Sequence, residues 1–179
     1  MAKKISKNFF NRPADVVAKD LLGKILVRKI NGKLLKAKIV ETEAYFSEED
    51  PASWAKLGKR KDNLHMWSEA GTILVKNVHM YLMLNFVVGK KGKAGAVLIR
   101  ALEPINFEGR CSGPGLLSRE MKIEKNFNGK NIFEMEDFFI ENNKENLEIE
   151  SSFRIGVRND LEKHFRFYIK GNRFVSVGR

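Results

Sequence analysis

The sequence predicts an α+β protein with mostly antiparallel strands in a single domain. Short apolar runs rich in β-branched and aromatic residues alternate with Gly- and Asn-containing turn signals. Helix signals are few, and neither an internal repeat nor a linker divides the chain. The 179 residues, 43% of them hydrophobic, suit one domain with a sizeable core. We therefore expect residues 1–179 to form one domain.

The first half begins with a helix and a hairpin. Pro13 in a first turn and Asp15 near the positive end of the helix dipole favour a helix that stops at Gly23. Asn31-Gly32 is a strong two-residue hairpin signal, because both turn residues must reach positive φ. The elements expected here are strands over 25–30 and 34–45, a short helix capped by Asp50 and Pro51, and a polar loop over 57–70.

The second half reads mainly as strands. The apolar run over 72–88 predicts one or two strands, and the Lys-rich run over 89–93 predicts a turn whose charges face water. The remaining elements expected are a buried strand over 94–102, a helix from Ser112-Gly113-Pro114 to about Ile123, a hairpin around residues 142–144, and strands over 165–169 and 174–177 joined at Gly171-Asn172.

Charge suggests the class of partner. Lys and Arg number 33 against 22 Asp and Glu, a net charge of +11. Such an excess favours a polyanion, with nucleic acid first and an anionic membrane surface second, although a Lys-rich composition alone could produce it. Seven acids and one base lie between Glu134 and Glu150, so this stretch should face away from a nucleic acid.

Composition also excludes several classes. The lone cysteine, Cys111, allows neither an internal disulfide nor an all-cysteine metal site and fits a reducing cytosol. The three histidines are too dispersed to suggest a metal centre. The basic N-terminus lacks the apolar stretch of a signal peptide, and no apolar run reaches membrane-spanning length, so no membrane partner is expected.

Three polar features interrupt apolar strands. Side chains alternate along a strand, so Glu41, Glu43 and Tyr45 share a face and could place a general base beside a stacking ring, or could be solvated acids on an exposed edge. Arg100 ends an apolar run and either leaves the core or orients an anion. Asn85 is either a satisfied strand residue or an amide that reads a base.

These segments resemble the alkyladenine (3-methyladenine) DNA glycosylase family. The resemblance rests on Ile-Val-Glu-Thr-Glu-Ala-Tyr (39–45), Gly71-Thr72, Leu-Ile-Arg-Ala-Leu-Glu-Pro (98–104), Ser-Gly-Pro-Gly-Leu-Leu (112–117), Arg-Ile-Gly-Val (154–157), Arg-Phe-Tyr-Ile-Lys-Gly (166–171) and Val-Ser-Val (175–177), in the family's order. It implies a curved, mostly antiparallel sheet with surrounding helices and a protruding β-hairpin. It also implies hydrolytic excision of damaged purines from double-stranded DNA by a monomer without metal or cofactor, in the cytoplasm or nucleoid, or in a eukaryotic nucleus.

The resemblance assigns roles to individual residues. Glu43 matches the general base that activates water towards the sugar C1′, and Arg100 matches the residue that orients it. Tyr45 matches a pocket wall whose ring favours cationic alkylated purines, and Asn85 matches the residue that excludes the guanine amine. The nucleotide must be flipped out of the duplex, and His79 with Met80 and Tyr81 matches the minor-groove wedge.

Three positions depart from the family. Trp54 stands where a pocket His is expected. A pocket with this Trp should still accept alkylated bases, whereas excision of hypoxanthine stays an open question. Lys76 replaces a second pocket Tyr, and His79 replaces the wedge Tyr. Lys76 is either a surface lysine or an amine that adds lyase activity through a Schiff base. The same sequence would also suit a non-catalytic damage-binding module or a protein that coats nucleic acid in general.

Overall fold

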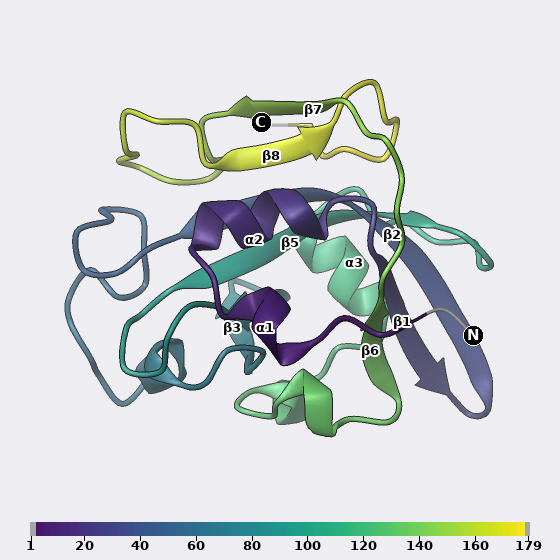
Figure 1. Cartoon of the computed structure of the whole chain (residues 1–179), viewed down its shortest axis with the longest axis horizontal. Coiled ribbons are helices and arrows are strands. Elements are labelled where there is room, and N and C mark those ends of the chain that lie inside the picture. Colours follow the sequence, from purple (N-terminus) through teal and green to yellow (C-terminus); the bar gives the residue numbers. More distant parts are fainter. Residues whose placement is uncertain (1–2, 178–179) are drawn as a thin grey trace.

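The computed structural model describes residues 3–177, whose strands form one curled, eight-stranded antiparallel sheet (Figure 1). Its main path runs β3-β4-β5-β2-β1-β6, while β8 pairs with β2 and β7 pairs with β8. The helices are α1 (Lys7–Phe10), α2 (Ala14–Leu21) and α3 (Pro114–Glu120), with 3-10 turns η1 (Leu64–Trp67), η2 (Lys125–Phe127) and η3 (Ile132–Glu134). The strands are β1 (Ile25–Ile30), β2 (Lys33–Tyr45), β3 (Ile73–Val78), β4 (Tyr81–Val87), β5 (Ala96–Pro104), β6 (Phe138–Glu141), β7 (Ile149–Ser152) and β8 (Arg166–Ile169).

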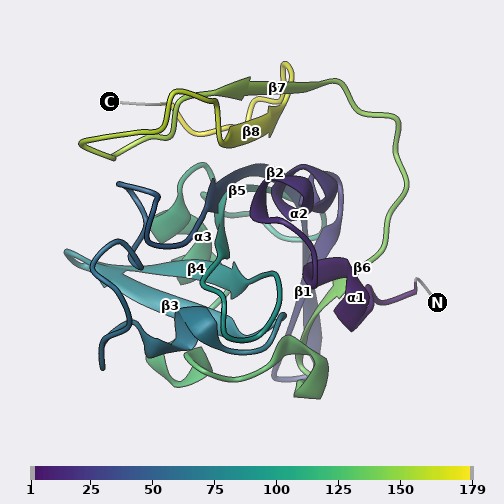
Figure 2. The same cartoon turned by 60° about the vertical axis from the view of Figure 1, so that its left-hand side comes forward.

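Strand β2 is the centre of the sheet. One edge pairs with β5, and the other pairs with β1 over 33–38 and with β8 over 41–43. The register against β5 shifts on both sides of Glu41, which is the mark of a bulge. Both views show β7 and β8 displaced from the rest of the sheet, with α2 beneath them (Figures 1 and 2). The end of β2 that carries Glu41 and Glu43 is therefore enclosed by strands and by α2.

The hydrophobic core joins segments from the whole chain. Helix α2 buries Val17 and Leu21, which lie four residues apart on one face. The rings of Phe10, Phe86 and Phe138 are fully buried, and their successive centroids lie 5.3 and 6.4 Å apart. These contacts tie α1, β4 and β6 together around the sheet.

Local turn signals are confirmed. Asn31 and Gly32 have φ values of 48° and 79° and connect β1 to β2. Gly23, with φ of 81°, follows the end of α2. The run over 72–88 forms two strands, with a turn at His79 and Met80 in which His79 has φ of 55°. That this β3–β4 hairpin protrudes from the body of the protein stays a prediction.

Three expected elements are wrong. The acidic stretch forms no hairpin around 142–144, because β6 pairs with β1 and β7 pairs with β8. Residues 174–177 form turns and coil that lie against β2 instead of a strand. Asp50 starts turns rather than a helix, because its carboxylate accepts the N–H groups of Phe46 and Ala52 and binds Arg154. Helix α3 also ends at Glu120, short of residue 123.

The acidic stretch pairs with nearby lysines. Glu141 binds Lys36 at 2.9 Å, Glu145 binds Lys38 at 3.1 Å, and Glu148 binds Lys170 at 2.6 Å. Much of its negative charge is thus neutralised locally. Within residues 3–177 there is no helix with the length and apolar character that crossing a membrane requires.

Candidate active site

A cavity of about 400 Å³ opens where the ends of β2 and β5 meet the β3–β4 hairpin and the loop over 155–157. Its size is in the range of small-molecule sites. It brings together five of the residues singled out in the sequence: Tyr45, Trp54, Lys76, Asn85 and Arg100. Residues separated by as much as 55 positions therefore share one pocket.

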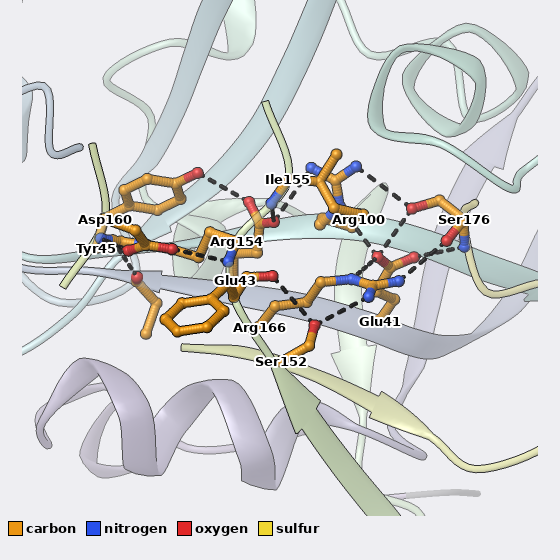
Figure 3. Close-up of polar contacts among 12 residues, drawn as sticks. Glu41, Glu43, Tyr45, Arg100, Ser152, Arg154, Ile155, Asp160, Arg166 and Ser176 are labelled. Atoms are coloured by element: carbon orange, nitrogen blue, oxygen red, sulfur yellow. Dashed lines mark hydrogen bonds and ion pairs between the residues drawn. The ribbon is translucent and has the colours of Figure 1, made fainter. Parts of the chain in front are cut away.

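Glu43 is fully buried behind residues that line this cavity, and Figure 3 shows its polar contacts. Its Oε2 accepts the Tyr45 hydroxyl at 2.8 Å, and its Oε1 accepts the Ile155 N–H at 2.7 Å. The Arg100 guanidinium lies 3.3 Å from the same Oε1. Tyr45, Ile155 and Arg100 all line the cavity, so the carboxylate sits directly behind its surface. The expectation of solvated acids on an exposed strand edge is wrong.

Burial and hydrogen bonding have opposite effects on the pKa of Glu43. Burial raises the pKa of the carboxyl above its usual range, while Arg100, the Ile155 N–H and the Tyr45 hydroxyl lower it in part. Burial beside Glu43 also raises the pKa of Tyr45 well above its usual value, so this hydroxyl stays protonated and donates to the carboxylate. A raised pKa and several donors suit a group that takes up a proton.

Glu41 holds Arg100 in place. Its Oε1 accepts Arg100 Nε at 3.0 Å, Arg166 Nε at 2.7 Å and the Ser176 hydroxyl at 2.8 Å. Its Oε2 accepts the Ser176 N–H at 2.6 Å. Both oxygens of this buried carboxylate are thus engaged, and Arg100 spans Glu41 and Glu43.

Arg154 clamps the loop that carries Ile155. Its guanidinium is completely buried between Asp50, at 2.7 Å from both Nη atoms, and Asp160, at 2.6 Å from Nη2. It also donates to the Ala44 carbonyl at 2.9 Å and lies 4.7 Å from the centre of the Tyr45 ring. These bonds fix the loop next to the end of β2, and so fix the Ile155 N–H on Glu43.

Trp54 and Lys76 form another wall of the cavity. Both are half-buried, and the Lys76 ammonium lies 4.6 Å from the centre of the Trp54 ring. Burial lowers the pKa of Lys76, opposed in part by Asp62. Lys76 is therefore a half-buried residue that lines the cavity, and its role as a contact to phosphate or solvent stays a prediction.

Asn85 lines the cavity from β4. Its amide nitrogen donates to the carbonyls of Leu74 at 3.2 Å and Met83 at 3.1 Å. Both amide hydrogens are engaged by backbone, and this fixes the orientation of the side chain in the pocket.

His79, Met80 and Tyr81 lie together at the turn of the β3–β4 hairpin and do not line the cavity. Met80 is 92% exposed, the most exposed large hydrophobic side chain of the described residues. Tyr81 differs from its two neighbours, because its ring packs against Gly115 so closely that a Cβ there would lie 2.6 Å from it.

The sequence reasoning missed the residues that support Glu43. Asp50 was expected only as a helix cap, and Asp160 carries no motif of its own. Arg154, Arg166 and Ser176 lie in the segments Arg-Ile-Gly-Val, Arg-Phe-Tyr-Ile-Lys-Gly and Val-Ser-Val, which contributed to the family resemblance and were the available signal. Over residues 3–177, no group of three or more His, Cys, Asp or Glu is arranged to hold a metal ion.

Comparisons with known proteins agree with one another. The model of the methylpurine-DNA glycosylase family matches residues 8–173. A protein of Aeropyrum pernix named "Putative 3-methyladenine DNA glycosylase" is 40% identical, over 100% of this chain and 96% of its own length. Proteins of the same name from Clostridium perfringens strain SM101 and Legionella pneumophila strain Corby are each 39% identical, over 97% of this chain and 98% of their own lengths. The chain therefore belongs to the methylpurine-DNA glycosylase family, whose members are DNA-repair hydrolases acting on N-glycosidic bonds.

Proposed function

We propose that Glu43 activates a water molecule that hydrolyses the N-glycosidic bond of a damaged purine held in the cavity. The observation that carries this proposal is the buried carboxylate of Glu43, fixed by three donors directly behind the wall of a 400 Å³ pocket. A general base must be positioned as well as basic, and these contacts supply both conditions.

The two carboxylate oxygens of Glu43 differ in how many further hydrogen bonds they can accept. Oε1 already meets the Ile155 N–H and Arg100, whereas within residues 3–177 Oε2 accepts only the Tyr45 hydroxyl. A carboxylate oxygen has two lone pairs, so Oε2 can accept a second donor, the attacking water, once the Tyr45 side chain bonded to it shifts and admits the water. The water transfers a proton to Glu43 as its oxygen bonds to C1′, and the base departs with the electrons of the glycosidic bond. Negative charge on Glu43 offsets the positive charge that develops on the sugar.

The buried position of Glu43 requires base flipping. C1′ of a stacked nucleotide cannot approach a carboxylate with no exposed surface, so the nucleotide must leave the duplex and enter the cavity. His79 and Met80 at the hairpin turn are the side chains that fill the resulting gap from the minor groove, with Tyr81 holding the turn against Gly115. Tyr45 and Trp54 stack on the flipped base, and Asn85 excludes the guanine amine.

The same proposal covers the partner and the domain. The net charge of +11, with the acids of 134–150 largely paired among local lysines, supports binding to double-stranded DNA wherever the genome is kept. The continuous sheet supports a single glycosylase domain, and we propose that this domain acts as a monomer.

We propose that the reaction stops at base release. Lyase activity would require the Lys76 amine to attack C1′, but its ammonium lies over the Trp54 ring, on the side of the pocket that stacks the base. Borohydride should therefore trap no covalent complex with damaged DNA. An adduct that forms with the native protein and disappears in K76A would establish the lyase instead.

The replacement E43Q tests the proposal. It preserves the shape of the side chain and removes the base, so single-turnover release of purines from methylated duplex DNA should fall by about 10²–10⁴-fold. Binding to the same DNA should persist. E108Q, which alters an exposed carboxylate, is the matched control.

Three results would contradict this function. Release by E43Q at the native rate would remove Glu43 from the reaction. DNA retardation without release of any base by the native protein would identify a damage-binding module, and binding without preference for a lesion would identify a general coating protein.

A further inference from the structure

Each of the two aromatic side chains that line the cavity carries a cation of this chain on its ring. Arg154 lies 4.7 Å from the centre of the Tyr45 ring, and Lys76 lies 4.6 Å from the centre of the Trp54 ring. Aromatic rings attract cations through their electron-rich faces. An incoming base with a positive charge therefore gains less cation–π attraction from these rings, because each ring already interacts with a cation of the protein.

The two cations differ in whether a nearby carboxylate neutralises their charge. Arg154 is buried between two carboxylates, so its charge is neutralised at short range. The Lys76 ammonium, by contrast, has no salt bridge or hydrogen bond with any residue in the described range 3–177. It lies on the Trp54 ring at the cavity wall, and the charges of Lys56 and Asp62 act on it in opposite directions without forming an ion pair with it.

An ammonium that has no ion pair acts oppositely on two kinds of lesion. Methylation at N7 of guanine or N3 of adenine gives the base in DNA a fixed positive charge, which Lys76 repels. Deamination of adenine gives hypoxanthine, which is neutral and presents the O6 and N7 acceptors of a 6-oxopurine to a donor. Two unit charges a few ångströms apart interact strongly in a partly buried site.

We propose that Lys76 is a specificity-determining residue that favours neutral purine lesions with an acceptor edge, the 6-oxopurines, over purines with a fixed positive charge. Lys76 changes the relative rates of excision and leaves the reaction itself to Glu43, so this inference rests on the proposed function. It also opposes the preference for alkylated bases that Trp54 alone predicts, because the indole face is shared with the ammonium.

The test compares two duplexes of identical sequence, one with a single hypoxanthine and one with a single 7-methylguanine. Single-turnover rates are measured with excess protein, and release in the presence of E43Q is subtracted as background. The selectivity is the hypoxanthine rate divided by the 7-methylguanine rate. K76M keeps the length of the side chain and removes its charge, so this ratio should fall on the order of tenfold. K76R, which restores a cation, should keep the ratio close to that of the native protein.

K33M is the matched control, because it removes one positive charge from an exposed position at the start of β2, at the end of the strand opposite the cavity. It should leave the ratio unchanged. Equal changes of both rates in K76M, or the same shift in K33M, would overturn the inference. Failure of the proposed function looks different, because then the native protein releases neither base, or E43Q releases both at the native rate.

Discussion

The Glu43 wall and the Lys76 wall of the cavity are built in opposite ways. Around Glu43, buried charges are paired: Glu41 binds two arginines, and Arg154 binds two aspartates. Around Lys76, a half-buried cation rests on an indole ring and leads to an exposed hairpin turn. Because unpaired buried charge is costly, the first region tolerates little change, whereas the second can vary without loss of the fold. In the function that we propose, the first region holds the general base, and the second selects the damaged base that is excised.

The largest effect should come from breaking the paired region at Glu41. E41Q leaves Arg100 and Arg166 without their shared carboxylate, and removing one partner of a buried pair costs about 3–5 kcal/mol of unfolding free energy. Urea denaturation measures this loss. E148Q, which alters the exposed pair with Lys170, should cost less than about 1 kcal/mol. Equal losses in the two variants would remove the contrast between buried and exposed pairs.

A smaller effect should appear in the pH dependence of Y45F. Base release requires ionised Glu43, so the rate should rise with pH through the raised pKa of this carboxyl. The Tyr45 hydroxyl stabilises the ionised form, so Phe should raise the pKa further and move the acid limb of the rate profile to higher pH. Single-turnover rates across the acid range measure the shift, with Y168F as control. An unmoved or lowered limb would contradict the role of the hydroxyl.

The smallest effect on stability should come from the hairpin turn. Met80 is 92% exposed, so M80A should change the unfolding free energy by no more than about 0.5 kcal/mol. Release from duplex DNA should still fall several-fold, while release from single-stranded DNA, which leaves no gap to fill, should not. I105A is the control, because it removes an exposed side chain just beyond β5, at the opposite end from the cavity. It should change neither the stability nor the release of bases from duplex DNA. Equal losses on both kinds of DNA would exclude a wedge.

Local signals predicted the fold where short-range physics determines it. Asn31-Gly32 and Gly23 were correctly assigned because positive φ is a property of single residues. The hairpin predicted for the acidic stretch was wrong because β6 pairs with β1 and β7 pairs with β8. These pairings depend on packing between segments that are distant in the sequence. Two adjacent strand-like segments suggest a hairpin, but the sequence contains no direct record of the strand to which each one pairs.

The candidate site was likewise predictable only in part. Glu43, Tyr45 and Arg100 lie in distinctive motifs, and the structure brings them together. The supporting contacts join residues separated by 104 positions, between Asp50 and Arg154, and by 135 positions, between Glu41 and Ser176. Spacing cannot predict such pairs, and no periodicity links them. Lys76 and Trp54 were each noted singly, and only the structure pairs them.

The length of these connections has a consequence for biosynthesis. Glu43 is translated 112 residues before Ile155, the residue whose N–H fixes it. A nascent chain emerges N-terminal end first, so the Glu43 carboxylate leaves the ribosome without the loop, the arginine clamp or the Ser176 contact. Assembly of the site must await the late closure of these non-local contacts, which is the slow step expected of a fold with high contact order. A ribosome-bound chain that stops before Arg154 should therefore be unable to release damaged bases from the DNA it meets.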